Sequence, residues 1–324
     1  MANKKFSEFT VKTDPANVDF LVGYDGTDNV RIDPSNLGGG GASDLNGLTD
    51  CLVDTASLYV GEVPSGLSGN PQGNTVLGID AGSSLTSGGY NTLIGYLSGV
   101  AINSGNFNIT VGYEAGNNIT SGSDNVAIGR GSLNVTNGSN TVAVGYFTGA
   151  LSSSANATYF GTQAGRANQN TGHVSIGYQA GYSQTSGSNN TNLGFEAGYS
   201  NTTGAFRTML GYQAGKSQTG GANTFIGSLA GGSRSGSGTQ NVAIGNNALR
   251  YLENADNTAI GSAAGQYADS TSSKNVMIGS QAMAGAFGSK SIFIFKASKT
   301  SPDPHLDETA LLPCFATLMP ILDN

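Results

Sequence analysis

The 324-residue sequence contains no tryptophan, only two cysteines and only eight prolines. Cys51 and Cys314 lie in different regions, so they do not form a disulfide framework, and we interpret both as free thiols. Charged residues make up 11% of the chain, the net charge is −7, and no basic cluster occurs beyond Lys4 and Lys5. This charge distribution argues against nucleic-acid binding. No apolar run reaches the length of a membrane span, and no apolar stretch follows the basic start, so we expect neither membrane insertion nor a secretory signal.

Glycine, in contrast, is abundant, with 50 residues. A segment resembling Asn-Val-Ala-Ile-Gly, often followed two residues later by Ala-Gly, returns every 16 to 18 residues, and residues 125–129 are its clearest copy. This period is too short for a repeat built from two helices. It suits one turn of a β-solenoid, in which each coil contacts only its neighbours. We therefore predict an all-β fold, a parallel β-solenoid of about thirteen short coils.

The last glycine of each copy is an anchor that aligns the repeats. The anchors are residues 78, 95, 112, 129, 145, 161, 177, 194, 211, 227, 245, 261 and 279. An apolar residue directly precedes each anchor, and a β-branched residue lies two positions earlier, which predicts a short strand with one buried face. The variable residue between them is predicted to lie on a less constrained face. The residues before the anchors, which we expect to form a structural core or a trimer ridge, are Leu77, Ile94, Val111, Ile128, Val144, Phe160, Ile176, Leu193, Leu210, Ile226, Ile244, Ile260 and Ile278.

The rest of each repeat is rich in Ser, Thr, Gly and Asn, which is turn chemistry. We expect each coil to contain one strand, a tight corner, a second weak strand and a polar turn. The recurrent Asn before the strand is expected to hydrogen-bond to its equivalent in the next coil. A coil this small has little interior to offset its conformational entropy. We therefore expect a homotrimeric rod in which the apolar strand faces are covered by sister chains.

The composition divides the chain into four regions. Residues 1–37 are predicted to form a small β module, with a hairpin around the turn at Asp25 and Gly26. Residues 38–73 are a Gly-rich linker and adaptor, in which Leu45 to Leu52 could form one helical turn. Residues 74–298 hold the repeats, with a degenerate fourteenth unit at 291–295. Residues 299–324 differ in composition and are interpreted as a C-terminal cap or tip.

The repeat resembles the head domain of trimeric autotransporter adhesins, which implies a left-handed parallel β-roll. Units such as Gly-Tyr-Gln-Ala-Gly at 177–181 and 211–215 are similar to those of tail-fibre proteins of tailed bacteriophages, especially marine ones. Residues 5–37 resemble the N-terminal segment of structural proteins of cyanobacterial phages. The resemblance covers most of residues 5–285. The chain shows neither the signal peptide and C-terminal barrel of secreted autotransporters nor the self-cleaving chaperone domain of many phage fibres.

Several motifs suggest chemistry but have simpler explanations. The segment 210–217 resembles a phosphate-binding loop but is one residue too short, and no helix pattern follows it. Glu253 and Asp269 each lie eight residues after an anchor and could form a carboxylate pair about 5 Å apart, the separation that retaining glycosidases use. His173 and His305 are isolated, and no Cys/His cluster has metal-ligand spacing. We therefore expect no enzyme, no cofactor and no metal site.

Aromatic residues directly follow several anchors, and stacked coils would align them along one edge. We expect them to pack between coils or chains, although such ladders can also bind sugars through their ring faces. These residues are Tyr96, Tyr113, Tyr146, Tyr178, Phe195 and Tyr212.

From the repeat and the resemblance we expect a structural and adhesive fibre or spike on the exterior of a phage virion. Residues 1–37 would dock to a tail or capsid protein, with Phe6, Phe9, Phe20 and Tyr24 as candidate contacts. The β-roll would project towards a glycan or protein receptor on the host surface. The alternatives are a polysaccharide-degrading tailspike that uses Glu253 and Asp269, and a bacterial surface adhesin.

Overall fold

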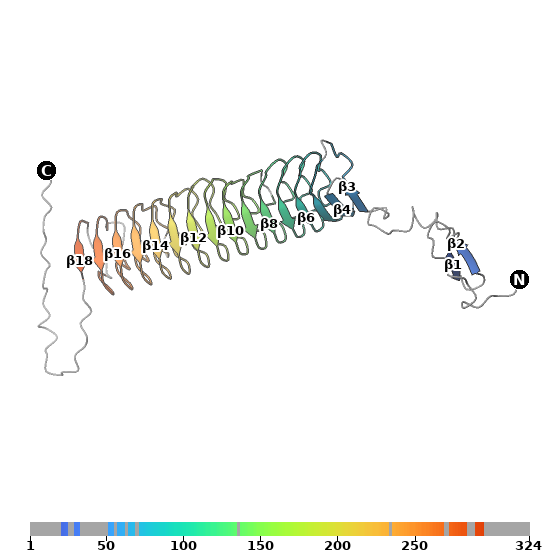
Figure 1. Cartoon of the computed structure of the whole chain (residues 1–324). Helices are drawn as coiled ribbons and strands as arrows, with labels where there is room; N and C mark the ends of the chain where they lie inside the picture. Colours follow the sequence, from blue (N-terminus) through green and yellow to red (C-terminus); the bar gives the residue numbers. More distant parts are fainter. Residues whose placement is uncertain are drawn as a thin grey trace, which may run out of the picture.

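The structure is a computed structural model in which one long solenoid dominates the described part of the chain (Figure 1). Its strands stack side by side along the rod, one strand for each coil. The structure describes residues 21–24, 29–32, 51–54, 57–61, 64–68, 71–134, 137–232, 235–268, 272–283 and 289–294.

Fifteen consecutive strands, β4 to β18, pair in parallel and in sequence order, which confirms the predicted β-solenoid. The register is constant, so that Leu77 pairs with Ile94 and Val111 pairs with Ile128. The strands are β4 (Ser57–Gly61), β5 (Thr75–Gly78), β6 (Thr92–Ile94), β7 (Ile109–Val111), β8 (Val126–Ile128), β9 (Val142–Val144), β10 (Thr158–Phe160), β11 (Val174–Ile176), β12 (Thr191–Leu193), β13 (Thr208–Leu210), β14 (Thr224–Ile226), β15 (Val242–Ile244), β16 (Thr258–Ile260), β17 (Val276–Ile278) and β18 (Ile292–Ile294).

The interior of the coil is lined by the middle residue of each strand. This residue is buried in every strand from β5 to β17, whereas the residues on either side of it are exposed or half-buried. The prediction that the middle residue lies on the less constrained face is therefore wrong. The interior accepts side chains of very different size and polarity in equivalent places, from Ala127 to Asn192 and Phe225.

An asparagine ladder stabilises one wall of the coils, as the sequence predicted. The side-chain oxygen of Asn91 accepts hydrogen bonds from the backbone N–H and the side-chain amide of Asn108, at 2.9 and 3.1 Å. The amide of Asn108 also donates to the carbonyl of Gly122 in the turn of its own coil, at 2.9 Å. Asn108 therefore satisfies its polar atoms while it ties one coil to the next. The same ladder continues through Asn125 and resumes at Asn241 and later rungs.

The segment after each strand is a series of turns, and the expected second strand is not present in the described coils. Residues two and four positions after the anchor adopt a left-handed conformation, with φ of 51° at Gln179 and 59° at Gly181, which an extended strand does not allow. The anchor glycines are needed for close approach. A Cβ placed on Gly129, where φ is 117°, would lie 2.5 Å from the carbonyl oxygen of Gly145 in the next coil.

The solenoid begins before the expected start of the repeats and includes the expected fourteenth unit. The degenerate unit at the C-terminal end is confirmed, because β18 pairs in parallel with β17. At the other end β4 pairs in parallel with β5 and buries Tyr59, so a coil lies in the region expected to be an adaptor. Its anchor is Gly61, and Ser57 occupies the place of the asparagine and accepts the backbone N–H of Asn74 at 2.9 Å.

The remaining described strands lie before the parallel stack. Strand β3 (Cys51–Asp54) pairs antiparallel with β4, so the end of the segment expected to be a helical turn is extended. The rest of that segment lies outside the described residues. Strands β1 (Leu21–Tyr24) and β2 (Asn29–Ile32) form an antiparallel pair. The turn at Asp25 and Gly26 that the hairpin was expected to contain lies outside the described residues.

Candidate functional site

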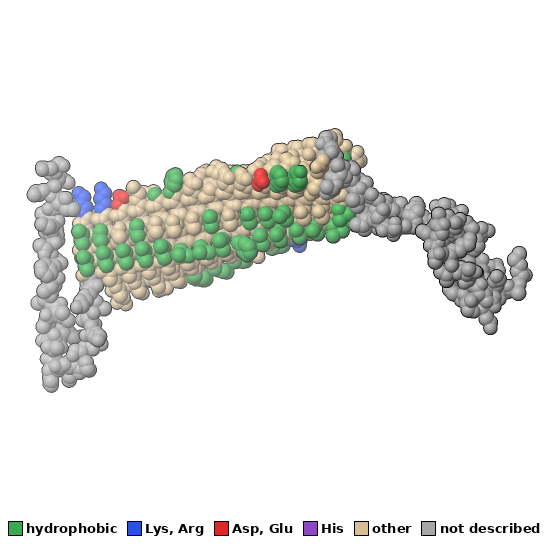
Figure 2. Space-filling model, in the orientation of Figure 1, with side chains coloured by type: hydrophobic (Ala, Val, Ile, Leu, Met, Phe, Trp, Pro, Cys, Tyr) green, Lys and Arg blue, Asp and Glu red, His purple; other side chains and the backbone are tan. Residues whose placement is uncertain are grey.

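The outward face of the sheet carries the most continuous surface feature of the solenoid. The thirteen residues that precede the anchors lie in one register, strand after strand, and we call this row the apolar file. In this single chain they do not contribute to the interior, and Phe160 is 53% exposed and Leu77 48%. A second row runs parallel to it and holds the β-branched residues, such as Thr75 and Val142. Figure 2 shows the hydrophobic side chains as a band along the rod.

The aromatic residues after the anchors are also aligned, and part of their row is stacked face to face. Tyr178, Phe195 and Tyr212 have ring centroids 5.1 and 5.5 Å apart and interplanar angles of 15° and 16°. Because these rings cover one another's faces, the inner faces of this stack are not available to a sugar. The geometry therefore agrees with the expected packing role between coils for these three residues.

The row has a different character around Arg130. The guanidinium carbon of Arg130 lies 5.5 Å from the ring centroid of Tyr113 and 5.7 Å from that of Tyr146, which belong to the preceding and following coils. The ring of Tyr96 is tilted by 37° against that of Tyr113. Sequence reasoning did not single out Arg130, although its place directly after anchor Gly129 marks it as the one cation in a row of rings.

In the segment that resembles a phosphate loop, the lysine is paired with an acidic side chain. The amine of Lys216 forms an ion pair with the carboxylate of Glu196 at 2.7 Å, and Gln213 donates a hydrogen bond to the same oxygen at 2.7 Å. Burial raises the pKa of Glu196, but the hydrogen bonds from Lys216 and Gln213 outweigh this effect and hold the pKa below its usual value. The segment runs from strand β13 into turns, and no helix follows it in the described coils. It is therefore part of the ordinary coil structure.

The other chemical candidates are not brought together in the described residues. Glu253 is among the described residues, but Asp269 lies outside them, so their pairing is not observed. His305 and Cys314 also lie outside them, as do the candidate docking residues Phe6, Phe9 and Phe20; Tyr24, the fourth candidate, lies in β1. Across the described part, no group of three potential metal-binding side chains is found. No described helix has the length and apolarity to cross a membrane.

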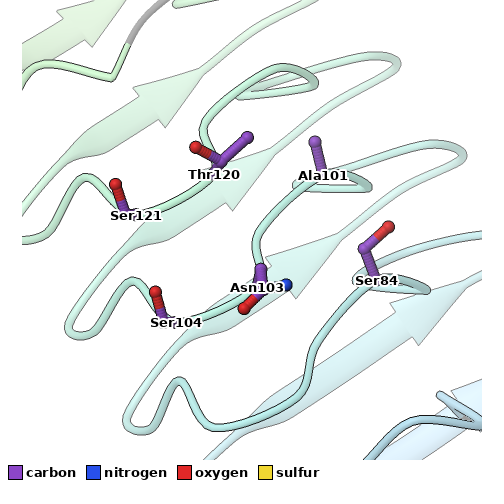
Figure 3. Close-up of a pocket in the computed structure, with 6 residues that line it drawn as sticks. All are labelled: Ser84, Ala101, Asn103, Ser104, Thr120 and Ser121. Carbon is purple, nitrogen blue, oxygen red and sulfur yellow. The ribbon is translucent and has the colours of Figure 1, made fainter.

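An open polar depression crosses three coils on the turn side of the solenoid (Figure 3). It contains hydroxyl and amide groups but no titratable side chain. Near it, the hydroxyl of Thr86 donates to the side-chain oxygen of Asn103 at 2.8 Å, which links adjacent coils. This surface offers hydroxyl and amide groups for hydrogen bonding, and its lining residues include no base that could activate a hydroxyl. Its lining residues are Ser84, Ala101, Asn103, Ser104, Thr120 and Ser121.

The interior contains a polar stretch that sequence reasoning missed. The buried apolar residues form two clusters, one that ends near Ala164 and one that begins near Ala197. His173 occupies the asparagine position of a coil between the two clusters, and Arg207 occupies the same position in a coil of the second cluster. Both side chains are 1% exposed. Both ring nitrogens of His173 and two guanidinium nitrogens of Arg207 have no hydrogen-bond partner. Burial lowers the pKa of His173 to about 4 and that of Arg207 to about 9.

Together these features describe an exposed apolar file that runs beside a row of aromatic side chains. Comparison with known proteins adds no identification: no protein-family model matches the chain, and no curated protein and no solved structure matches it significantly.

Proposed function

We propose that this chain is a structural and adhesive fibre or spike of a bacteriophage virion, and that three copies associate along their apolar files to form the rod. The N-terminal region docks to the particle, and the β-solenoid projects towards the host. The observation that carries the proposal is the unbroken apolar file on the outward face of a very narrow coil.

The exposed file is large enough to drive association. Fully burying an aliphatic side chain contributes roughly 1.5–3 kcal/mol. Seven residues of the file are 37–53% exposed, and the other six are half-buried. Covering all thirteen would therefore contribute on the order of 10 kcal/mol for each chain. This contribution is comparable with the estimated 4–15 kcal/mol that association costs in lost freedom of motion, and the β-branched row adds to it.

Sister chains are the partners that match this surface. The file repeats once per coil and extends along the whole stack, so a partner must present apolar side chains at the same spacing over the same length. A second copy of the chain meets both conditions without any change of register. Closed symmetry then buries the file completely, because identical chains around a common axis leave no open apolar edge.

The proposal predicts the oligomeric state of the purified protein. Light scattering of the full chain should give three times the chain mass of 32.7 kDa. A stable mass near 33 kDa would contradict the trimer. The variant Ile128→Asp should shift the mass downward, because a charge in the file loses its hydration when the chains meet. The matched variant Asn118→Asp, at an exposed position outside the file, should leave the trimer intact.

The virion role rests on the resemblance of residues 5–37 and of the repeat to phage structural proteins. It predicts that antibody raised against the solenoid labels an external appendage of intact phage particles in electron micrographs. It also predicts that the purified protein, added in excess, competes with the phage for attachment to host cells. Labelling that is absent from particles but present on bacterial surfaces would support the bacterial adhesin instead.

A further inference from the structure

Arg130 differs from the other residues of its row because a cation stands where most coils around it carry a ring. Consecutive coils stack in register, so Tyr113 lies on one side of the guanidinium along the rod and Tyr146 on the other. A third ring, that of Phe147, has its centroid 5.8 Å from the guanidinium carbon. The rings hold the guanidinium by cation–π attraction, which acts on its faces and leaves its N–H groups unused.

Other cations near aromatic rings in the described coils have polar partners. Arg166 donates a hydrogen bond to the hydroxyl of Tyr182. Lys216 forms its ion pair with Glu196, and Arg250 donates to the side-chain oxygen of Asn247 at 3.3 Å. Arg130 is exposed and, within the described residues, makes no hydrogen bond and no ion pair through its side chain.

The nearby acid does not neutralise Arg130. Glu114 is the acidic neighbour in the adjacent coil, and within the described residues it forms no ion pair with Arg130. A hydrogen bond with Glu114 raises the pKa of Tyr113. The guanidinium therefore presents a planar set of donors that is held in place and remains available to a ligand. A carboxylate matches this set, because its two oxygens can accept two parallel N–H donors.

We propose that Arg130 and the rings of Tyr113 and Tyr146 form a subsite for the carboxylate of an acidic glycan. The subsite rests on the proposed attachment function and specifies the class of ligand, a polysaccharide that contains uronic acids. Arg130 binds the carboxylate in a bidentate manner, and the flanking rings contact the apolar edge of the sugar. A trimer presents three such subsites, so the binding of a long polymer gains from avidity even when each contact is weak.

The test measures binding of the full-length protein to three immobilised polymers of matched length: alginate, which carries carboxylates, dextran, which is neutral, and dextran sulfate. We expect binding to alginate that exceeds binding to dextran. The variant Arg130→Gln should weaken alginate binding by about tenfold, as expected when a charge-assisted hydrogen bond is lost. Arg130→Lys keeps the charge but loses the planar donors, and should weaken it by a smaller factor.

Lys274→Gln is the matched control, because it removes the same charge from an exposed side chain far along the stack. Equal weakening by Lys274→Gln and Arg130→Gln would overturn the subsite, since only net charge would then matter. Unchanged binding by Arg130→Gln, equal binding to dextran, or binding to dextran sulfate alone would also overturn it. Light scattering on the same samples separates this failure from that of the proposed rod: a trimer that does not bind alginate refutes only the subsite.

Discussion

Replacing Arg207 by asparagine should stabilise the protein, although it removes a large buried side chain. Arg207 occupies a rung of the asparagine ladder, where its backbone N–H donates to the side-chain oxygen of Asn190 at 2.9 Å. The arginine side chain has no oxygen that could accept a hydrogen bond from Asn223 in the next coil. The amide of Asn223 donates instead to the carbonyls of Gly220 and Gly238, at 3.0 and 2.8 Å. Asparagine at position 207 would restore the missing rung.

The magnitude follows from the buried charge. Burial lowers the pKa of Arg207 from its usual value to about 9, and both values lie above neutral pH, so at pH 7 the side chain is charged in the folded and the unfolded chain. The difference between the two pKa values therefore opposes folding. At 1.36 kcal/mol per pKa unit, it lowers the free energy of unfolding by at most about 5 kcal/mol. The void left by the shorter side chain costs about 1–3 kcal/mol. We expect a net gain of about 2 kcal/mol.

The assay is thermal unfolding followed by circular dichroism at pH 7 and at a fixed protein concentration. The Tm of Arg207→Asn should exceed that of the wild type. Arg207→Met removes the charge without restoring the ladder, so its Tm should lie between those of the wild type and Arg207→Asn. A Tm for Arg207→Asn that equals or lies below the wild-type value would refute the reasoning that this buried guanidinium opposes folding.

Three further predictions concern the glycines, the interior histidine and the apolar file. Gly129→Ala should lower the Tm strongly, because the new Cβ would lie 2.5 Å from the carbonyl oxygen of Gly145; an unchanged Tm would contradict the close approach. His173 has its pKa lowered from 6.5 to about 4, so its contribution to stability is complete above pH 6.5 and is lost, by up to about 3 kcal/mol, as the pH falls through 4. His173→Asn should reduce this acid sensitivity in melts at pH 7 and pH 4.5, and identical pH profiles would refute it. Ala127→Asp should unfold the coil, whereas Ile128→Asp should leave circular dichroism of the chain largely unchanged and prevent association; the reverse pattern would contradict the assignment of the two faces.

The repeat period was sufficient to predict the solenoid, its register and its ladder. A spacing of 16 to 18 residues between anchors allows one strand per coil, and equivalent residues such as Leu77 and Ile94 must then align. The asparagine ladder was predictable because a buried, recurring amide needs a partner at the same spacing. The degenerate unit at Ile292–Ile294 was also recognisable, because its alternation survives without the glycine.

The face of the strand could not be predicted from hydrophobicity. The outward residues of the file are uniformly large and apolar, whereas the interior position varies from Ala127 to Asn192, so the outward row gave the stronger apolar signal. The interior position holds side chains that range from alanine to tyrosine, so neither size nor polarity identifies it. Three-residue strands also contain too little alternation to distinguish the two sides. The first coil was missed because Ser57 replaces the asparagine, although Gly61 lies 17 residues before Gly78.

The interior irregularities were visible in the sequence only as missing asparagines. His173 and Arg207 replace the asparagine, as Thr141 and Ala157 also do, but the sequence alone does not show that the position is buried. Arg130 was missed for a related reason. Its environment depends on residues 17 before it and 16 after it, which become neighbours only when the register is known.

The most direct test of the account is cross-linking through the apolar file. In a protein whose Cys51 and Cys314 are replaced by serine, Ile128→Cys should form disulfide-linked pairs of chains under mild oxidation. The same change at exposed Asn118, outside the file, should not. Cross-linking at both positions or at neither would contradict the claim that sister chains cover this face.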